Sequence, residues 1–415
     1  MKLTKMALLA AAAAAASGAA SAPSGRQVVT GPVATYWMSA ATTSGMASMM
    51  GAGGRPSMAS ILAMRNGGGN GYSHSLVLQL GSSQRPDGPP AAEHDPPQGL
   101  GAGPVLPLAT PEPAVAPMHV ESEPGPPPQY HQPHGRMLIF WGCGEHAPAG
   151  QPLVIDFAQA AEGRMPPQFA ALMQGLAVRP MQPPSPARDT TYGEWPNRRG
   201  GTQAPPSGSL QGEHVIHGNY SPEIKFTLGP SQDFLPPIVL TSNAKTATGS
   251  VSLAWRPVDG ARGYFAAMLG AEGKDQVVMW TSSATQTAAF ALPDYLSDGE
   301  IGRLVASRAL MNGATTSCLV PQEAVAAAGR GGFFQLAAYG GESNFSWPPR
   351  PPAPRPWNIA WQVKVRYKST TSGILGMDMG RMMSGGDDAD RDGEAQPRQR
   401  QKPSLFNPLG GLFPH

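Results

Sequence analysis

Charge, long apolar runs and cysteine are all scarce in this chain. Charged residues make up 14% of the 415, and 30 lysines and arginines stand against 28 aspartates and glutamates. A surface that neutralises phosphates normally shows a basic excess or stripe, so the balance argues against nucleic acid as a partner. Beyond the N-terminal segment no stretch approaches the ~20 apolar residues that cross a bilayer, which argues against a membrane span in the mature chain.

The first residues have the pattern of a secretory signal peptide. Lys2 and Lys5 form a positive region, and residues 6–16 form a short apolar stretch rich in alanine. Small residues follow, so we expect cleavage after Ala19 or Ala20 and a signal peptide over residues 1–20. The pattern predicts an exported protein in the periplasm, at the cell surface or outside the cell, with a protein or other envelope component as its partner.

The two cysteines, Cys143 and Cys318, lie in different halves of the chain. Export would place them in an oxidising compartment, where a disulfide can persist. Each also lies in a hydrophobic neighbourhood, and cysteine is often buried without a bridge. Both readings stay open. A bond would join the halves across a long loop and stabilise the fold by ~3–5 kcal/mol in the chain-entropy model.

Glycine and proline are abundant, with 51 and 46 residues. This composition argues against long helices. Proline is concentrated in three blocks, at about 85–134, 180–211 and 347–357. Because proline lacks an amide hydrogen and has a fixed φ, we expect these blocks to be extended coil or polyproline II rather than central strands.

Short runs typical of strands lie between the blocks. In the first half they are Val28–Ser39, Ser75–Leu80, Met137–Trp141 and Leu153–Phe157. They predict a β-rich N-terminal domain over 26–178, with the proline-rich block at 85–134 as a surface insertion. Apolar residues at helical spacing predict one helix within 158–178. A Pro/Gly-rich linker over 179–212 would follow.

The second half alternates more clearly. Val251, Leu253 and Trp255 are two residues apart, which places them on one face of a strand within 250–257. A turn at Asp259-Gly260 leads to two further predicted strands. These strands are Tyr264–Leu269 and Gln276–Thr281.

The stretch GSVSLAWRPVDGARGYFAAMLG resembles strands B and C of a fibronectin type III domain. Trp255 stands where that family has its core tryptophan, and Tyr264 opens the segment that resembles strand C. Residues Phe333–Asn344, reading FFQLAAYGGESN, resemble strand F, and Trp361–Tyr367 fits strand G. The resemblance implies a two-sheet sandwich over 213–370.

One departure from that family is large, because this chain has an insertion at 292–332 where the family has a short turn. Pro321 and Gly329 frame a short helix over Gln322–Ala328 within the insertion. The predicted fold class is therefore mainly β, with two β-sandwich-like domains, proline-rich linkers and a disordered tail over 371–415. The stretches GRMLIFWGCGE and PSQDFLPPIVL also resemble uncharacterised exported proteins of alphaproteobacteria, which carry no known activity to transfer.

No catalytic motif is complete. Gly71–Ser75 approaches the G-x-S-x-G pattern of serine hydrolases, but it lacks the final glycine and a preceding strand. Cys143 has His146 close by as a base, whereas such bases normally come from elsewhere in the fold. We therefore expect no enzyme, no catalytic residue and no cofactor. A hydrolase site assembled from distant residues stays an alternative.

Metal binding is a second alternative. His131 with His134 and His214 with His217 could each supply two ligands, but positions three apart face opposite sides of a strand. Thioethers suit copper(I), and methionines gather in two clusters. These are Met46, Met49 and Met50, then the weak copper candidates Met377, Met379, Met382 and Met383. Asp388, Asp390 and Asp392 are spaced like the start of a calcium loop, without its closing glutamate.

The tail ends in an apolar segment that could dock onto a partner. Its candidate docking residues are Leu405, Phe406, Leu409, Leu412 and Phe413. The leading hypothesis is a non-enzymatic envelope or surface protein with a binding or structural role. The alternatives are periplasmic copper binding through the methionine and histidine clusters, and a cell-envelope hydrolase.

Overall fold

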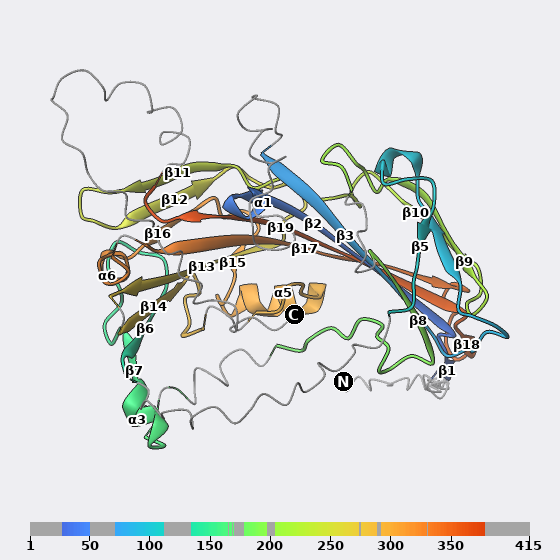
Figure 1. The fold of residues 1–415 in the computed structure, drawn as a ribbon, viewed down its shortest axis with the longest axis horizontal. Helices are drawn as coiled ribbons and strands as arrows, with labels where there is room; N and C mark the ends of the chain where they lie inside the picture. Colours follow the sequence, from blue (N-terminus) through green and yellow to red (C-terminus); the bar gives the residue numbers. More distant parts are fainter. Residues whose placement is uncertain are drawn as a thin grey trace, which may run out of the picture.

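A long, twisted sheet of ten strands dominates the fold (Figure 1). The structure is a computed structural model and describes residues 27–49, 71–111, 134–164, 166–167, 169, 178–196, 204–273, 275–288, 292–329 and 331–377. Along the long sheet the strand order is β7 (Leu153–Asp156), β6 (Arg136–Trp141), β14 (Gln276–Thr281), β13 (Gly263–Glu272), β17 (Phe333–Trp347), β19 (Trp361–Ile374), β2 (Ala34–Gly45), β3 (Tyr72–Ser82) and β8 (Thr191–Trp195). The short β15 (Met311–Asn312) pairs with β13.

Strands from both halves of the chain meet in this sheet. β2 runs parallel to β19, with Ala34 beside Trp361 and Gly45 beside Ser372. β6 likewise runs parallel to β14. Parallel neighbours need long connections, so distant parts of the sequence supply adjacent strands. The long sheet thus contains strands from both sides of the predicted linker.

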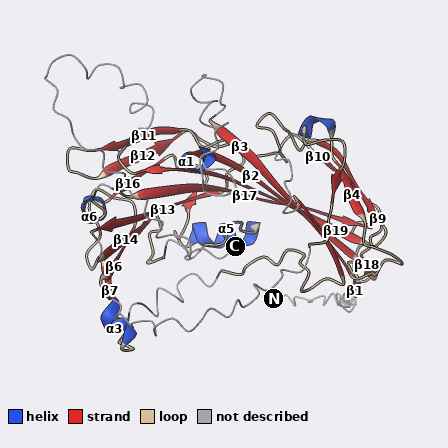
Figure 2. Cartoon of the chain, in the orientation of Figure 1, coloured by secondary structure: helices blue, strands red, loops and turns tan. Residues whose placement is uncertain are grey.

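Two smaller sheets pack on one face of the long sheet (Figure 2). One has the order β10 (Ile224–Leu228), β9 (Gly212–Gly218), β4 (Ala92–Asp95) and β5 (Leu106–Pro107). The other has the order β11 (Leu240–Lys245), β12 (Val251–Trp255) and β16 (Ser317–Val320). Tyr36 of β2 contacts His94 in the first sheet, and Tyr264 of β13 contacts Trp255 in the second. The described chain is therefore mainly β and sandwich-like, as the sequence predicts.

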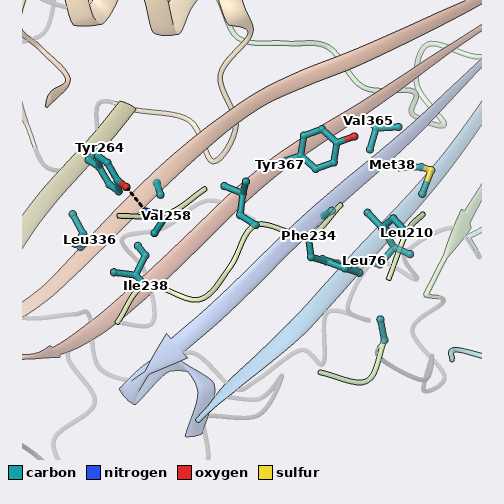
Figure 3. Close-up of a cluster of buried hydrophobic side chains, with 14 of the residues drawn as sticks. Met38, Leu76, Leu210, Phe234, Ile238, Val258, Tyr264, Leu336, Val365 and Tyr367 are labelled. Carbon is teal, nitrogen blue, oxygen red and sulfur yellow. Dashed lines mark hydrogen bonds between the residues drawn. The ribbon is translucent and has the colours of Figure 1, made fainter. Parts of the chain in front are cut away.

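The segment between the two smaller sheets completes the core (Figure 3). Phe234 and Ile238 are buried, and the hydroxyl of Thr42 donates to the carbonyl of Leu235 at 2.6 Å. The Tyr264 hydroxyl accepts from the backbone N–H of Val258 at 3.1 Å. Hydroxyls of the long sheet thus satisfy one backbone group of this segment and one of the loop between β12 and β13.

The opposite face of the long sheet is covered differently. Helix α5 (Asp298–Ala306) packs Ile301 and Leu304 against Phe265 and Tyr339 of the sheet. Ser297 caps the helix, because its side chain accepts from the N–H of Glu300. The other short elements are β1 (Val29–Thr30), β18 (Trp357–Asn358), α1 (Met46–Met49), η1 (Gln98–Leu100), α3 (Phe157–Ala161) and α6 (Gln322–Ala327). Within the described ranges no helix has the length and apolar character needed to cross a membrane.

The predicted strands are confirmed in both halves. β14 has the predicted bounds, and the others agree within several residues. The turn at Asp259-Gly260 and the short helix after Pro321 are also present. Of the helix predicted within 158–178, α3 covers the start, and residues 165, 168 and 170–177 lie outside the described part.

The proline-rich block at 85–134 is not a surface excursion in its described part. β4 lies between β9 and β5 in the four-stranded sheet, and Leu100 and Leu106 are fully buried. Proline is tolerated because Pro107 belongs to β5, a two-residue edge strand. The expectation of coil fails because the exclusion applies only to the prolines themselves, and the four residues of β4 include none.

Three other boundaries also need correction. The linker predicted over 179–212 contains β8 at one edge of the long sheet, followed directly by Pro196. The insertion at 292–332 supplies β16, which pairs with β12. The disordered tail predicted over 371–415 is wrong at its start, because β19 continues to Ile374, and residues 378–415 lie outside the described part.

Candidate functional site

A row of cations lies on the face of the long sheet that turns away from the two smaller sheets. Side chains alternate along β19, so Val363, Val365 and Tyr367 enter the core. The intervening residues Lys364, Arg366 and Lys368 therefore share the other face, and we call them the cationic strip.

Arg366 is held between two aromatic rings. Its guanidinium carbon lies 5.1 Å from the ring centre of Trp37 and 4.4 Å from that of Tyr295. Its Nε donates to the hydroxyl of Ser39 at 2.7 Å. Trp37 and Ser39 come from β2, and Ser39 is directly opposite Arg366 in the register. Arginine suits this position because its planar group stacks on rings and keeps its charge.

The two lysines of the strip are each paired with a carboxylate. Lys364 Nζ lies 2.5 Å from Glu342 of β17, and Lys368 Nζ lies 3.0 Å from Asp294. Each lysine also lies over a ring, Lys364 over Trp37 and Lys368 over Tyr295. Both lysine charges therefore have a local counterion, whereas Arg366 forms no ion pair with any residue that the structure describes.

Burial shifts the pKa values of two groups in this site, Arg366 and Tyr295. It lowers the pKa of Arg366 from its ordinary value, while Asp294 and Glu342 act in the opposite direction. Arginine remains protonated in proteins even so. Burial also raises the pKa of Tyr295, so its phenol stays neutral. The result is a fixed positive charge between neutral rings.

The terminal nitrogens of Arg366 carry the chemistry of the site. Within the described residues they donate no hydrogen bond to a protein group, since the bond to Ser39 uses Nε. A guanidinium presents parallel donors that match the two oxygens of a carboxylate or a phosphate. The arrangement can therefore bind an acidic group at Arg366, because Lys364 and Lys368 already pair with Glu342 and Asp294.

Polar side chains continue from the strip across the sheet. Gln79 of β3 is opposite Trp37, and Glu194 of β8 is opposite Gln79. Gln79 Nε2 donates to the hydroxyl of Tyr192 at 3.1 Å, and that hydroxyl donates to Glu194 at 2.7 Å. This row extends the hydrogen-bonding surface from β19 to the edge strand β8.

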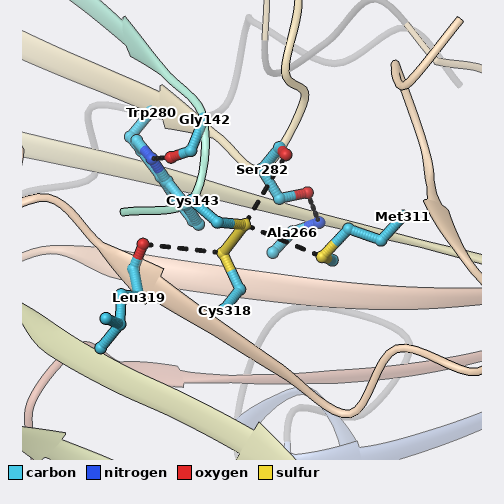
Figure 4. Close-up of a disulfide and its surroundings, with 8 residues drawn as sticks. All are labelled: Gly142, Cys143, Ala266, Trp280, Ser282, Met311, Cys318 and Leu319. Carbon is cyan, nitrogen blue, oxygen red and sulfur yellow. Dashed lines mark hydrogen bonds between the residues drawn. A yellow bond between two sulfur atoms is a disulfide. The ribbon is translucent and has the colours of Figure 1, made fainter. Parts of the chain in front are cut away.

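The two cysteines form a disulfide in the structure (Figure 4). Cys143 follows β6 of the long sheet and Cys318 lies on β16 of the three-stranded sheet, with Cα atoms 5.2 Å apart. The adjoining loop is fixed by two bonds: Gly144 N–H donates to Leu319 O, and Trp280 Nε1 donates to Gly142 O. The bond therefore joins the two layers of the sandwich.

The disulfide bears on the interpretation of Cys143 as a nucleophile. A bonded sulfur is not a thiolate, so Cys143 has no nucleophilic form in this state. His146 lies 3.0 Å from Glu323 of α6. The other weak catalytic candidate, Ser73, lies within β3 rather than on the sharp turn that a serine nucleophile needs.

The histidine pairs do not form a metal site in the described residues. His214 is buried, whereas His217 is half exposed and faces Glu93 and Asp95, because the two lie on opposite sides of β9. His134 lies 3.4 Å from Asp275, and His131 is outside the described part. No group of three potential metal ligands converges within the described ranges.

The remaining candidates fall mostly beyond the described residues. Met46 and Met49 belong to α1, and Met377 is 39% exposed at the end of the described chain. The others lie outside it: Met50, Met379, Met382, Met383, Asp388, Asp390, Asp392, Leu405, Phe406, Leu409, Leu412 and Phe413.

Sequence reasoning missed the cationic strip. A signal was present, because Lys364, Arg366 and Lys368 alternate with apolar residues in a predicted strand. The partners Trp37 and Tyr295 are distant in sequence, and only the pairing of β2 with β19 brings Trp37 to Arg366. No protein-family model, curated protein or solved structure matches the chain.

Proposed function

We propose that the chain is an exported, non-enzymatic envelope or surface protein whose cationic strip binds acidic groups of an envelope polymer. One observation carries the proposal: the Arg366 guanidinium is clamped by Trp37 and Tyr295, and its terminal nitrogens have no protein acceptor among the described residues. A charge held in this way is preorganised, so little side-chain entropy is lost when a ligand binds.

Two features support export. The N-terminal residues have the pattern of a secretory signal, and the Cys143–Cys318 bond belongs to a class that persists in oxidising compartments. The proposed location is the periplasm, the cell surface or the medium. Fractionation of cells that express the full chain tests it, and recovery only from the cytoplasm would refute it.

The strand order supports a fibronectin type III-like scaffold. The segments that resemble strands C, F and G are β13, β17 and β19, which are adjacent in the long sheet. The segment that resembles strand B is β12, which lies in the facing three-stranded sheet. Sandwiches of this class place strand B in one sheet and strands C, F and G in the other. Such scaffolds serve many functions, so the ligand is argued from the site alone.

The chemistry of the site favours charge recognition over stacking on a sugar ring. Trp37 and Tyr295 are 7% and 9% exposed, and cations already lie over both rings. The rings therefore order the cations and offer little surface to a ligand. A carboxylate or phosphate group on a polymer fits the guanidinium, whereas the charges of Lys364 and Lys368 are offset by Glu342 and Asp294.

Calorimetric titration with polygalacturonate, a carboxylate polymer, tests the proposal, with neutral dextran as the matched probe. We expect the protein to bind polygalacturonate and not dextran. The affinity should fall as salt is raised, because salt screens exposed charges. Arg366→Lys keeps the charge but removes the planar fork, and should weaken binding at least roughly ten-fold.

The control variant is Lys225→Gln, which removes an exposed lysine of β10 paired with Glu213. It should bind polygalacturonate like the unmodified chain. Thermal unfolding of both variants checks that they fold. Equal affinity of Arg366→Lys and Lys225→Gln, with both folded, would contradict the proposed site.

A further inference from the structure

One end of the elongated molecule combines exposed apolar residues with arginines. β1 and β18 lie at this end, beside the connection from β17 to β19 that reads WPPRPPAPRPW (Figure 1). Val28 is 59%, Val29 49% and Trp347 55% exposed. We call Val28, Val29, Trp347, Arg350 and Arg355 the arginine–tryptophan tip.

Side-chain contacts hold the tip in place. Gln27 Nε2 donates to the carbonyl oxygens of Pro351 and Arg355, at 3.0 and 2.8 Å. Arg350 Nε donates to Gln27 Oε1 at 2.9 Å, and its guanidinium lies 5.6 Å from the ring centre of Trp357. The exposed residues are thus presented on a fixed backbone, which lowers the entropy lost on binding.

The charge of the tip has one sign. Residues 27–33 and 345–360 contain Arg350 and Arg355 but no aspartate or glutamate. Tryptophan at the headgroup level, aliphatic side chains below it and arginines beside anionic lipid headgroups form the usual pattern of an interfacial contact. The charge and apolar character of the tip are therefore complementary to an anionic lipid surface.

The path of the chain points to the same partner. Gln27 is the first described residue and lies at the tip, and the sequence before it carries the predicted export signal. In the proposed export, that signal would be held in the membrane while it is attached, and Val28 and Val29 of the tip follow it in sequence. Export would therefore bring Val28 and Val29 of the tip close to a bilayer.

We infer that the arginine–tryptophan tip binds the surface of an anionic lipid bilayer. The inference rests on the proposed export of the chain. It assigns a surface separate from the cationic strip, whose ligand is a polymer, so the two proposals have separate tests.

Co-sedimentation of the full chain without residues 1–20 tests the inference. The probes are vesicles of phosphatidylethanolamine with phosphatidylglycerol, and vesicles of phosphatidylcholine alone. We expect binding to the anionic vesicles only. Arg350→Gln with Arg355→Gln should weaken it roughly 25-fold, at about five-fold for each arginine near the surface. Trp347→Ser should also weaken it.

The matched control is Arg256→Gln with Lys225→Gln, which removes two exposed cations elsewhere and should leave vesicle binding unchanged. Equal binding by the tip variant and this control overturns the inference. So does a loss of vesicle binding in Arg366→Lys alone, which would place lipid headgroups at the strip instead. Binding of polygalacturonate is measured separately, so its failure and the failure of vesicle binding are distinguishable.

Discussion

His94 Nε2 and His214 Nδ1 lie 2.9 Å apart in the interior, where the four-stranded sheet meets the long sheet. His214 Nε2 must donate to the Leu210 carbonyl at 2.7 Å, because a carbonyl only accepts. With both rings neutral, His94 Nε2 then donates to His214, and the Tyr36 hydroxyl donates to His94 Nδ1 at 2.9 Å. One arrangement of protons therefore satisfies all four groups, from the Tyr36 hydroxyl to the Leu210 carbonyl.

This series of hydrogen bonds predicts that the protein loses stability in acid. Burial lowers the pKa of His94 well below its usual value, with His214 acting in the same direction, and burial lowers the pKa of His214 to about 4. The unfolded chain therefore binds protons that the fold excludes. This stability is fully present above about pH 6.5, where unfolded histidine is neutral, and is lost as the pH falls towards 4. For His214 alone the loss is roughly 3 kcal/mol.

Urea unfolding between pH 4 and 7.5 measures this loss. His94→Leu with His214→Leu should remove most of the pH dependence in that window, whatever its effect on stability at pH 7.5. His217→Gln, which replaces a half-exposed histidine on the same strand, should keep the pH dependence. A double variant with the same pH dependence as the unmodified chain would show that the buried pair is not responsible.

The disulfide predicts a large effect of reduction on stability. Cys143 and Cys318 are 175 residues apart, and a loop of that length corresponds to about 5 kcal/mol in the chain-entropy model. Cys143→Ser with Cys318→Ser should unfold at a lower urea concentration and with a steeper slope, because the unfolded chain without the cross-link exposes more surface. Adding a reductant should shift the unmodified chain and leave the variant unchanged. An unshifted midpoint in reductant would count against a bond in solution.

Gly193 in β8 predicts a packing constraint at the edge of the long sheet. A Cβ there would lie 2.5 Å from the Tyr220 hydroxyl and 2.6 Å from the Leu108 carbonyl oxygen. Gly193→Ala should therefore destabilise the fold by roughly 1–3 kcal/mol, since the backbone must move. Gly299→Ala in α5 meets nothing within 4 Å and should stabilise by up to about 1 kcal/mol. The midpoints of thermal unfolding of the two variants measure these effects. A Gly193→Ala variant as stable as the unmodified chain would mean that β8 packs differently.

The strands could largely be predicted from the sequence because alternation is a local property. Trp255 and Tyr264 pack together, with ring centres 5.4 Å apart, as the two-sheet interpretation requires. The pairing of strands is not local. Nothing near Ala34 indicates Trp361 as its neighbour, so the meeting of the two halves in one sheet was outside what periodicity can predict.

The errors at prolines have a physical cause. Proline excludes a residue from a central ladder but permits it at an edge or a strand end. Pro107 is in the edge strand β5 and Pro196 directly follows β8, so short strands fit between prolines. Leu210 is fully buried within the predicted linker, because its carbonyl accepts from His214 and its side chain enters the core. Composition over long windows could not show these single positions.

The binding of an acidic group to Arg366 is tested most directly by side-chain NMR of chain labelled with ¹⁵N-arginine. Arg366→Lys identifies the resonances of this guanidinium by their absence. We expect polygalacturonate to shift these resonances in a saturable way and to leave those of Arg262, which is paired with Asp298, in place. Saturable binding with no change at Arg366 would contradict this expectation.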